Sequence, residues 1–173
     1  MSQVGKVESP ATQLEEPSFE DGKPLLIAGL KERLSGETMK NIPELWQRFG
    51  RYFGNIPGQV GRVAYGICSN MVPSPFGFDY MAGVEVSGTS GFPNEFSHVS
   101  VPAMRYVIFP HREHVSSLPK TIDAVHQNWL PGSGHVPARV DRDAPIMMER
   151  YGEGFDAQKG IAGRGESQFF VCL

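Results

Sequence analysis

The sequence lacks any long apolar run. No stretch of its 173 residues approaches the ~20 apolar residues of a membrane-spanning helix. The first 23 residues also lack the apolar centre of a secretory signal peptide. We therefore expect a cytoplasmic protein that does not enter a membrane. Its two cysteines, Cys68 and Cys172, are then expected to be reduced and structural.

Runs of basic residues are also missing. The formal net charge is -3, and the 16 lysine and arginine residues are scattered. A nucleic-acid-binding protein normally gathers such residues on one face. Only two helices are evident, and both are needed for the core, which leaves no helix-turn-helix pair. We expect no direct contact with nucleic acid.

Motifs for nucleophilic, metal or cofactor chemistry are scarce. There is no Gly-x-Ser-x-Gly, and Cys68 lies in an apolar run, as inert thiols do. The His-Arg-Glu-His run at 111–114 lacks further ligands nearby, so we interpret it as a solvated loop. The glycines of 152–165 do not form a phosphate loop and instead indicate a lid or hairpin. The sequence predicts no metal and no cofactor.

What the sequence does contain is a series of short apolar segments separated by turns. Residues 1–22 form a polar lead that we expect to be mobile, and 23–173 form the domain. Strands are predicted at 25–30, 63–68, 79–86, 101–110, 146–151 and 168–173, with an irregular loop at 69–77.

Two helices are predicted by matching start signals. Asn41-Ile42-Pro43 and Ser117-Leu118-Pro119 each join a capping residue to a proline in the first turn. The first helix extends toward Phe53, and the second ends near Pro131. The order strand, helix, strand, strand therefore occurs twice. It favours an α+β fold of two pseudo-symmetric units, with antiparallel sheets, a helix on each and a central ligand cleft.

Several segments together resemble the GyrI-like, or AraC-type, effector-binding domains of bacterial transcription regulators. These segments are Ile42–Phe49, Tyr65–Cys68, Phe78–Val86, Val101–Tyr106, Asn128–His135 and Met148–Tyr151. The resemblance implies the same two-unit fold and a cleft for apolar, often cationic compounds. In such regulators a buried glutamate on a late strand neutralises the ligand, and Glu149 is the matching position. Arg150 departs from the pattern, and a cation beside the acid would blunt affinity for cations.

Glu149 is the principal candidate ligand-binding residue. It shares one strand face with Met147 and Tyr151. A buried carboxylate is costly without a partner, so an apolar position suits it to receive a cation. Glu85 is a second candidate acid, on the strand face opposite the one expected to meet a helix. Aromatic rings could stack on the ligand, and the candidates are Tyr65, Tyr106, Tyr151, Phe109, Trp129 and Phe170.

Three functions are compatible with these observations. The first is a stand-alone module that binds an amphipathic organic molecule, either cationic or neutral, in transcription regulation or in sequestration of drugs and toxins. The second is a hydrolase of reactive small molecules that uses Glu149, Glu85 and a tyrosine as acid and base. The third is an interaction protein, as gyrase-inhibitor relatives are. Binding is favoured over catalysis, and a homodimer or a separate regulatory protein stays open as partner.

Overall fold

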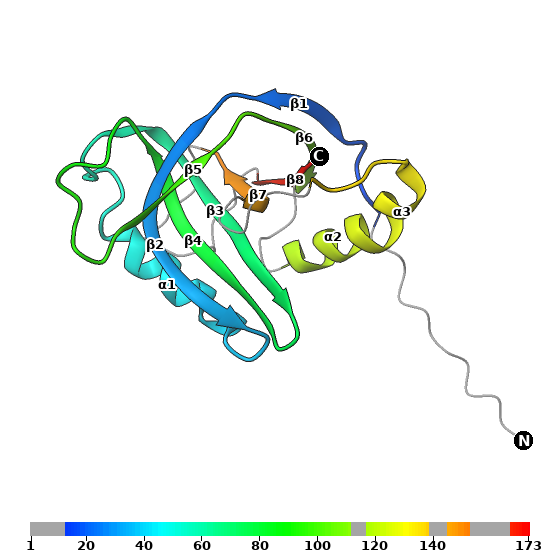
Figure 1. Ribbon diagram of the computed structural model, residues 1–173, viewed down its shortest axis with the longest axis horizontal. Coiled ribbons are helices and arrows are strands. Elements are labelled where there is room, and N and C mark those ends of the chain that lie inside the picture. The colour runs from blue at the N-terminus through cyan, green and yellow to red at the C-terminus, as the bar shows by residue number, and fades with distance from the viewer. Residues whose placement is uncertain (1–12, 112–116, 139–144, 153–166) are drawn as a thin grey trace, which may run out of the picture.

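A computed structural model describes residues 13–111, 117–138, 145–152 and 167–173. Eight strands form one antiparallel sheet in the order β1-β6-β8-β7-β3-β4-β2-β5 (Figure 1). The strands are β1 (Ser18–Gly22), β2 (Leu25–Ser35), β3 (Gln59–Pro73), β4 (Phe76–Val86), β5 (Ser97–Val101), β6 (Met104–His111), β7 (Pro145–Tyr151) and β8 (Ser167–Cys172). Among the described residues, no helix is long and apolar enough to cross a membrane.

The sheet is strongly curled. Strand β5 lies at one end of the order and β6 next to the other end, yet only Pro102 and Ala103 separate them in the chain. Because the three Cα–Cα steps from Val101 to Met104 reach at most about 11 Å, the two ends of the sheet must approach each other. The predicted strand at 101–110 is thus two strands: Val101 ends β5, and β6 begins at Met104.

The helical segments begin where predicted, but the first ends at Gly50, short of Phe53, and the second continues past Pro131 to Ser133. The short η1 (Met39–Asn41) leads into α1 (Ile42–Gly50), and α2 (Leu118–Ala124) continues through the π-helical η3 (Val125–Trp129) into α3 (Leu130–Ser133). Pro43 and Pro119 occupy first turns as predicted, but Asn41 makes no side-chain capping bond. Pro131 does not end the helix but lies in the first turn of α3, directly after the π-helical segment.

Side chains on the two faces of the sheet form two separate cores, as strand alternation requires. One core lies between the sheet and the helices and includes Trp46, Phe109 and Phe169. The other lies on the opposite face and includes Tyr106, Met148 and other apolar side chains. Neighbouring residues of one strand therefore belong to different environments, which determines what each can contact.

The two predicted halves share one sheet, whereas the sequence suggested separate sheets. Strands β3 and β7 pair directly, with Gly66 opposite Glu149, so hydrogen bonding continues from one half into the other. Outward from that central pair, the order is β3-β4-β2 in one half and β7-β8-β6 in the other. The α+β class and the antiparallel pairing agree with the prediction.

The predicted loop at 69–77 is instead the end of a long hairpin. Strands β3 and β4 stay paired as far as Pro73 and Phe76, with a bulge between Ser69 and Val72. Pro73 stands at the last pair and Pro75 in the turn, where no ladder hydrogen bond is required of a proline. The two prolines therefore mark the end of the hairpin and are compatible with the strand pairing that leads up to it.

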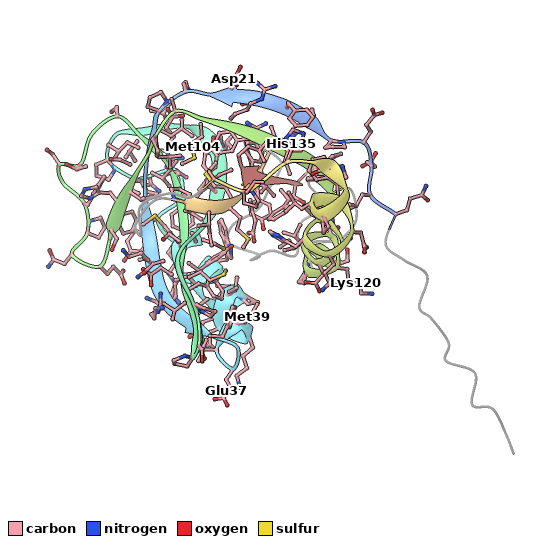
Figure 2. The ribbon with its side chains drawn as sticks, turned by 45° about the vertical axis from the view of Figure 1, so that its right-hand side comes forward. Asp21, Glu37, Met39, Met104, Lys120 and His135 are labelled. Atoms are coloured by element: carbon pink, nitrogen blue, oxygen red, sulfur yellow. The ribbon has the colours of Figure 1, made fainter. Side chains whose placement is uncertain are left out.

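Part of the predicted N-terminal lead is also a strand. β1 pairs with β6 at the edge of the sheet, and Leu14 packs against the helix-side core. The ring centroids of Phe19 and His135 are 5.2 Å apart. Figure 2 shows His135 in the segment that follows α3. This strand was not predicted, because most of its residues are polar and exposed. Residues 1–12 of the lead lie outside the described residues.

Candidate functional site

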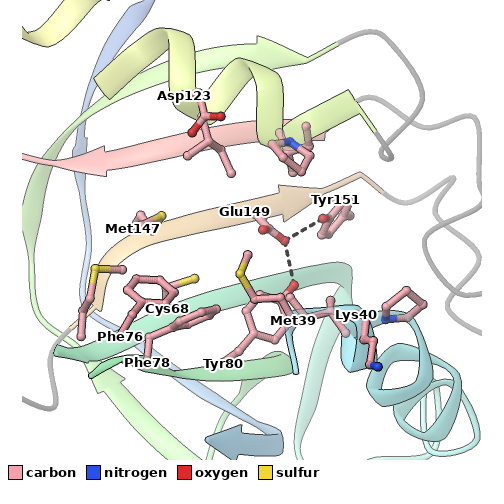
Figure 3. Close-up of a pocket in the computed structure, with 16 residues that line it drawn as sticks. Met39, Lys40, Cys68, Phe76, Phe78, Tyr80, Asp123, Met147, Glu149 and Tyr151 are labelled. Carbon is pink, nitrogen blue, oxygen red and sulfur yellow. Dashed lines mark hydrogen bonds between the residues drawn. The ribbon is translucent and has the colours of Figure 1, made fainter. Parts of the chain in front are cut away.

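A cavity of about 530 Å³ lies on the helix side of the sheet (Figure 3). Both halves of the chain contribute to it, through η1, α1, β3 and β4 from the first half and α2 and β7 from the second. The lining residues are Met39, Lys40, Ile42, Pro43, Cys68, Met71, Phe76, Phe78, Tyr80, Leu118, Pro119, Ile122, Asp123, Met147, Glu149 and Tyr151.

The cavity wall is mostly apolar and rich in aromatic rings and sulfur. Phe76, Phe78 and Met71 come from the end of the β3–β4 hairpin, and Met71 and Phe76 are partly exposed at 40% and 43%. Lys40 and Asp123 line it from the two helical sides and are exposed. Such a wall suits a ligand with a substantial apolar body.

Two carboxylates line the cavity, and Glu149 is the one that lies between two tyrosine hydroxyls. Alternation along β7 places Met147, Glu149 and Tyr151 on one face, as predicted, while Met148 belongs to the opposite core. Tyr80 and Tyr151 both donate hydrogen bonds to Glu149 Oε2, over 2.8 and 2.7 Å (Figure 3). In the part of the chain that the structure describes, Glu149 has no ion-pair partner.

Two residues behind the cavity make this arrangement fit. Trp46 of α1 is fully buried, and its indole Nε1 donates to Tyr80 Oη over 2.9 Å. Gly66 of β3 lies beside the acid, and a Cβ there would overlap both the Tyr80 hydroxyl and the Glu149 carboxylate. Only a glycine leaves room for Tyr80 to reach Glu149 across the strand.

Burial dominates the electrostatics of the site. Loss of water raises the pKa of Glu149 above its ordinary value, and the bonds from Tyr151 and Tyr80 partly oppose that rise. Burial, with the nearby carboxylate, also raises the pKa of both tyrosines and of Cys68 well above their usual values. The hydroxyls and the thiol therefore stay protonated at neutral pH, and the two hydroxyls serve as donors.

Three of the predicted aromatic residues lie on the other face of the sheet. Tyr65, Tyr106 and Phe170 belong to the core opposite the helices. Tyr106 and Phe170 contact each other at 5.3 Å between ring centroids, and none of the three lines the cavity. Burial raises the pKa of Tyr106 to about 12.

The two charged neighbours of these rings are also placed away from the cavity. Glu85 lies 3.9 Å from Lys23, between carboxylate and ammonium atoms, in a half-exposed ion pair. Arg150 donates to Gln168 over 2.8 Å, and its guanidinium stands 4.6 Å from the ring centroid of Phe170. The expectation that Arg150 sits beside the acid is wrong, because adjacent strand residues point to opposite faces.

Phe109 and Trp129 are on the helix side but pack as core residues. Their rings meet edge to face, 5.0 Å apart between centroids, and neither lines the cavity. Of the predicted ligand-binding side chains, the structure thus brings together Glu149 and Tyr151.

The structure does not place His111 in the solvated loop that the sequence predicts. It ends β6 with only 3% of its surface exposed, and its Nδ1 lies 3.0 Å from Thr121 Oγ1 on α2. The other residues of that run, 112–114, lie outside the described residues, as do residues 153–165 of the predicted lid. Among the described residues there is no group of three or more metal-ligating side chains.

Tyr80, Trp46 and Gly66 were not identified as site residues from the sequence. Alternation along 79–86 does put Tyr80 on the face that meets a helix, so its direction was available. The sequence could not show that Tyr80 meets Glu149 across β3, because the order of strands in a sheet cannot be read from one strand. Cys68, predicted to be an inert core thiol, is buried at 7% exposure but also lines the cavity.

Fold and cavity together define a small α+β domain built around a ligand-sized pocket. Residues 15–157 match the family model described as a GyrI-like small molecule binding domain. The chain belongs to this GyrI-like family, which confirms the resemblance seen in its motifs.

One relative of this chain is a transcription regulator. The transcriptional regulator BrlR of Pseudomonas aeruginosa is 32% identical over 116 residues. That match covers 66% of this chain but only 40% of BrlR, so the chain spans less than half of that relative.

Similar solved structures support the fold. SAV2435, solved with bound tetraphenylphosphonium, superposes with a TM-score of 0.65 at 16% identity, covering 91% of this chain and 93% of its own. EcmrR, solved in a complex with DNA, gives a TM-score of 0.61 at 12% identity and covers 91% and 57%. At these identities the likeness concerns the fold alone.

Proposed function

We propose that this protein binds amphipathic organic cations in the cavity, with Glu149 as the countercharge. One observation carries the proposal: the carboxylate of Glu149 stands in an apolar cavity, held by two hydroxyl donors and by no cation of the described chain. Taking an ion out of water costs several kcal/mol unless an opposite charge compensates. A positively charged ligand would supply that charge.

The rest of the cavity suits the apolar part of such a ligand. About 530 Å³ lies within the range of small-molecule sites, roughly 300–1,000 Å³. Phe76, Phe78, Tyr80 and Tyr151 can present aromatic rings to a cation or pack against its apolar groups. The capture of tetraphenylphosphonium by SAV2435, which shares this fold, supports the same ligand class here.

We further propose that binding serves transcription regulation or the sequestration of toxic compounds. The similarity to BrlR and to the EcmrR fold supports the regulatory role. Hydrolysis by Glu149 and Glu85 together is not supported by the geometry, because they lie on opposite faces of the sheet. We also infer that the two halves are related by pseudo-symmetry, which the strand order on either side of β3 and β7 supports.

The test compares a permanent cation with a neutral analogue. Isothermal titration would measure binding of tetraphenylphosphonium and of triphenylphosphine oxide to the wild type, Glu149→Gln and Glu85→Gln. Glu149→Gln should weaken binding of the cation by ~1.5–3 kcal/mol, because a charged interaction is lost, and should spare the neutral compound. Glu85→Gln is the matched control and should bind both normally. Equal losses for both compounds in Glu149→Gln, or none, would reject the role of Glu149.

A further inference from the structure

Behind the cavity, a buried tryptophan is hydrogen-bonded to one of the two donors of Glu149. We propose that Trp46 is a positioning residue that commits the Tyr80 hydroxyl to donate to Glu149 and so keeps the acid a receptor for cations. This inference rests on the function proposed above. Trp46 does not line the cavity, so a ligand would not touch it.

The direction of each hydrogen bond follows from the chemistry of the donors. An indole nitrogen carries a proton and can only donate. Trp46 Nε1 lies 2.9 Å from Tyr80 Oη, so the Tyr80 oxygen is the acceptor there. The single proton of the Tyr80 hydroxyl is then directed to Glu149 Oε2, which lies 2.8 Å away.

Both tyrosines donate to the same carboxylate oxygen. Tyr151 Oη is 2.7 Å from Oε2, the oxygen that Tyr80 also contacts. Two donors at one oxygen favour the ionised carboxylate over the acid, since a proton on that oxygen would face two other protons. Neither tyrosine bonds to Oε1, so this oxygen is the one left for a ligand's positive charge.

Trp46 also supports the second donor by packing. Its ring meets that of Tyr151 edge to face, with centroids 5.4 Å apart, and that of Phe49 in the same way at 5.7 Å. It is fully buried on α1, a separate element from the strands that carry the two tyrosines and the acid. One side chain of the helix thus contacts both donors of the carboxylate.

Without the indole proton, the Tyr80 oxygen would be free to accept a hydrogen bond from the protonated carboxyl group of neutral Glu149. The hydroxyl could then bond equally well to the acid or to the carboxylate, and its preference for the charged form would be lost. The pH at which cation binding disappears should therefore rise. Other titratable groups that line the cavity are Lys40, Cys68, Asp123 and Tyr151, and Trp46→Phe leaves all of them in place.

The experiment measures tetraphenylphosphonium binding as a function of pH. Titrations from pH 4.5 to 8.5 would give, for each variant, the pH at which affinity has fallen to half of its plateau. In Trp46→Phe this midpoint should lie higher than in the wild type by about 0.5–1 on the pH scale, with affinity at pH 8.5 within about threefold. Trp129→Phe, the same substitution on a helical tryptophan outside the cavity, should keep the wild-type midpoint.

A second pair of variants tests the route through Tyr80. Tyr80→Phe should raise the midpoint by itself, and adding Trp46→Phe to it should raise it no further. If Trp46→Phe does not fold, benzothienylalanine at position 46 keeps the ring shape without the N–H and should give the same raised midpoint.

Each result has a definite meaning. An unchanged midpoint in Trp46→Phe, including a uniform loss of affinity at every pH, overturns the positioning role and leaves the proposed function intact. A further rise in the double variant overturns the route through Tyr80. Wild-type protein that fails to bind the cation, or that binds it as well as Glu149→Gln does, overturns the proposed function itself.

Discussion

The two faces of the central strands carry similar side chains with opposite surroundings. On the helix side, Glu149 meets two tyrosine hydroxyls in an apolar cavity. On the other side, Glu85 meets a lysine and Arg150 meets Gln168 and an aromatic ring. Charge on the second face is compensated within the chain, whereas on the first face no cation of the described residues forms an ion pair with Glu149. This difference is why we propose Glu149, and not Glu85, as the acid that receives a cation.

The most severe way to break the helix-side arrangement is to fill the space beside the acid. In Gly66→Ala the new methyl group would overlap the Tyr80 hydroxyl and the Glu149 carboxylate. We expect at least a tenfold loss of cation affinity and a loss of ~1–3 kcal/mol in the free energy of unfolding. Calorimetric titration and urea unfolding would measure both. Gly88→Ala, where a Cβ meets nothing, should change neither quantity.

Removing one tyrosine hydroxyl should have a smaller effect on cation affinity. The size of that effect should depend on which face of the sheet carries the tyrosine. Tyr151→Phe loses a bond to a charged group and should weaken cation binding by roughly 1–2 kcal/mol, measured by titration at pH 8. Tyr65→Phe removes the same atom from the opposite face and should leave affinity unchanged. Equal losses in both variants would mean that the two faces are not distinct in function.

The acid on the helix side should also make folding depend on pH. Burial raises the pKa of Glu149 in the folded protein, so the folded state keeps a proton over a pH range in which the unfolded state has lost it. Stability must then fall as pH rises from the unfolded pKa through the folded one. In urea unfolding from pH 4 to 8, the free energy of unfolding of the wild type minus that of Glu149→Gln should decline and then level off. A difference that grows with pH would contradict the raised pKa.

Much of this comparison could be predicted from the sequence, because a strand's alternation is local. It placed Glu149 with Met147 and Tyr151 on one face, and Tyr80 toward a helix. It could not show that β3 lies between β4 and β7, so the meeting of Tyr80 with Glu149 across Gly66 was not foreseen. The sequence analysis chose aromatic residues on predicted strands, among them Tyr65, Tyr106 and Phe170. That criterion does not show which face of the sheet a ligand would contact.

The smallest expected effect concerns Arg150, the neighbour of the acid in sequence. Arg150 follows Glu149 directly in the chain, but its guanidinium lies on the opposite face of the sheet. There its Nη1 is 3.8 Å from Glu20 Oε1, and the group stands over the ring of Phe170. Arg150→Leu should therefore change tetraphenylphosphonium affinity by less than about twofold, because water and salt screen an outward charge. A marked gain in affinity, abolished by adding Glu149→Gln, would show that the two charges act on each other through the sheet. The faces would then be coupled electrically even though no side chain contact joins them.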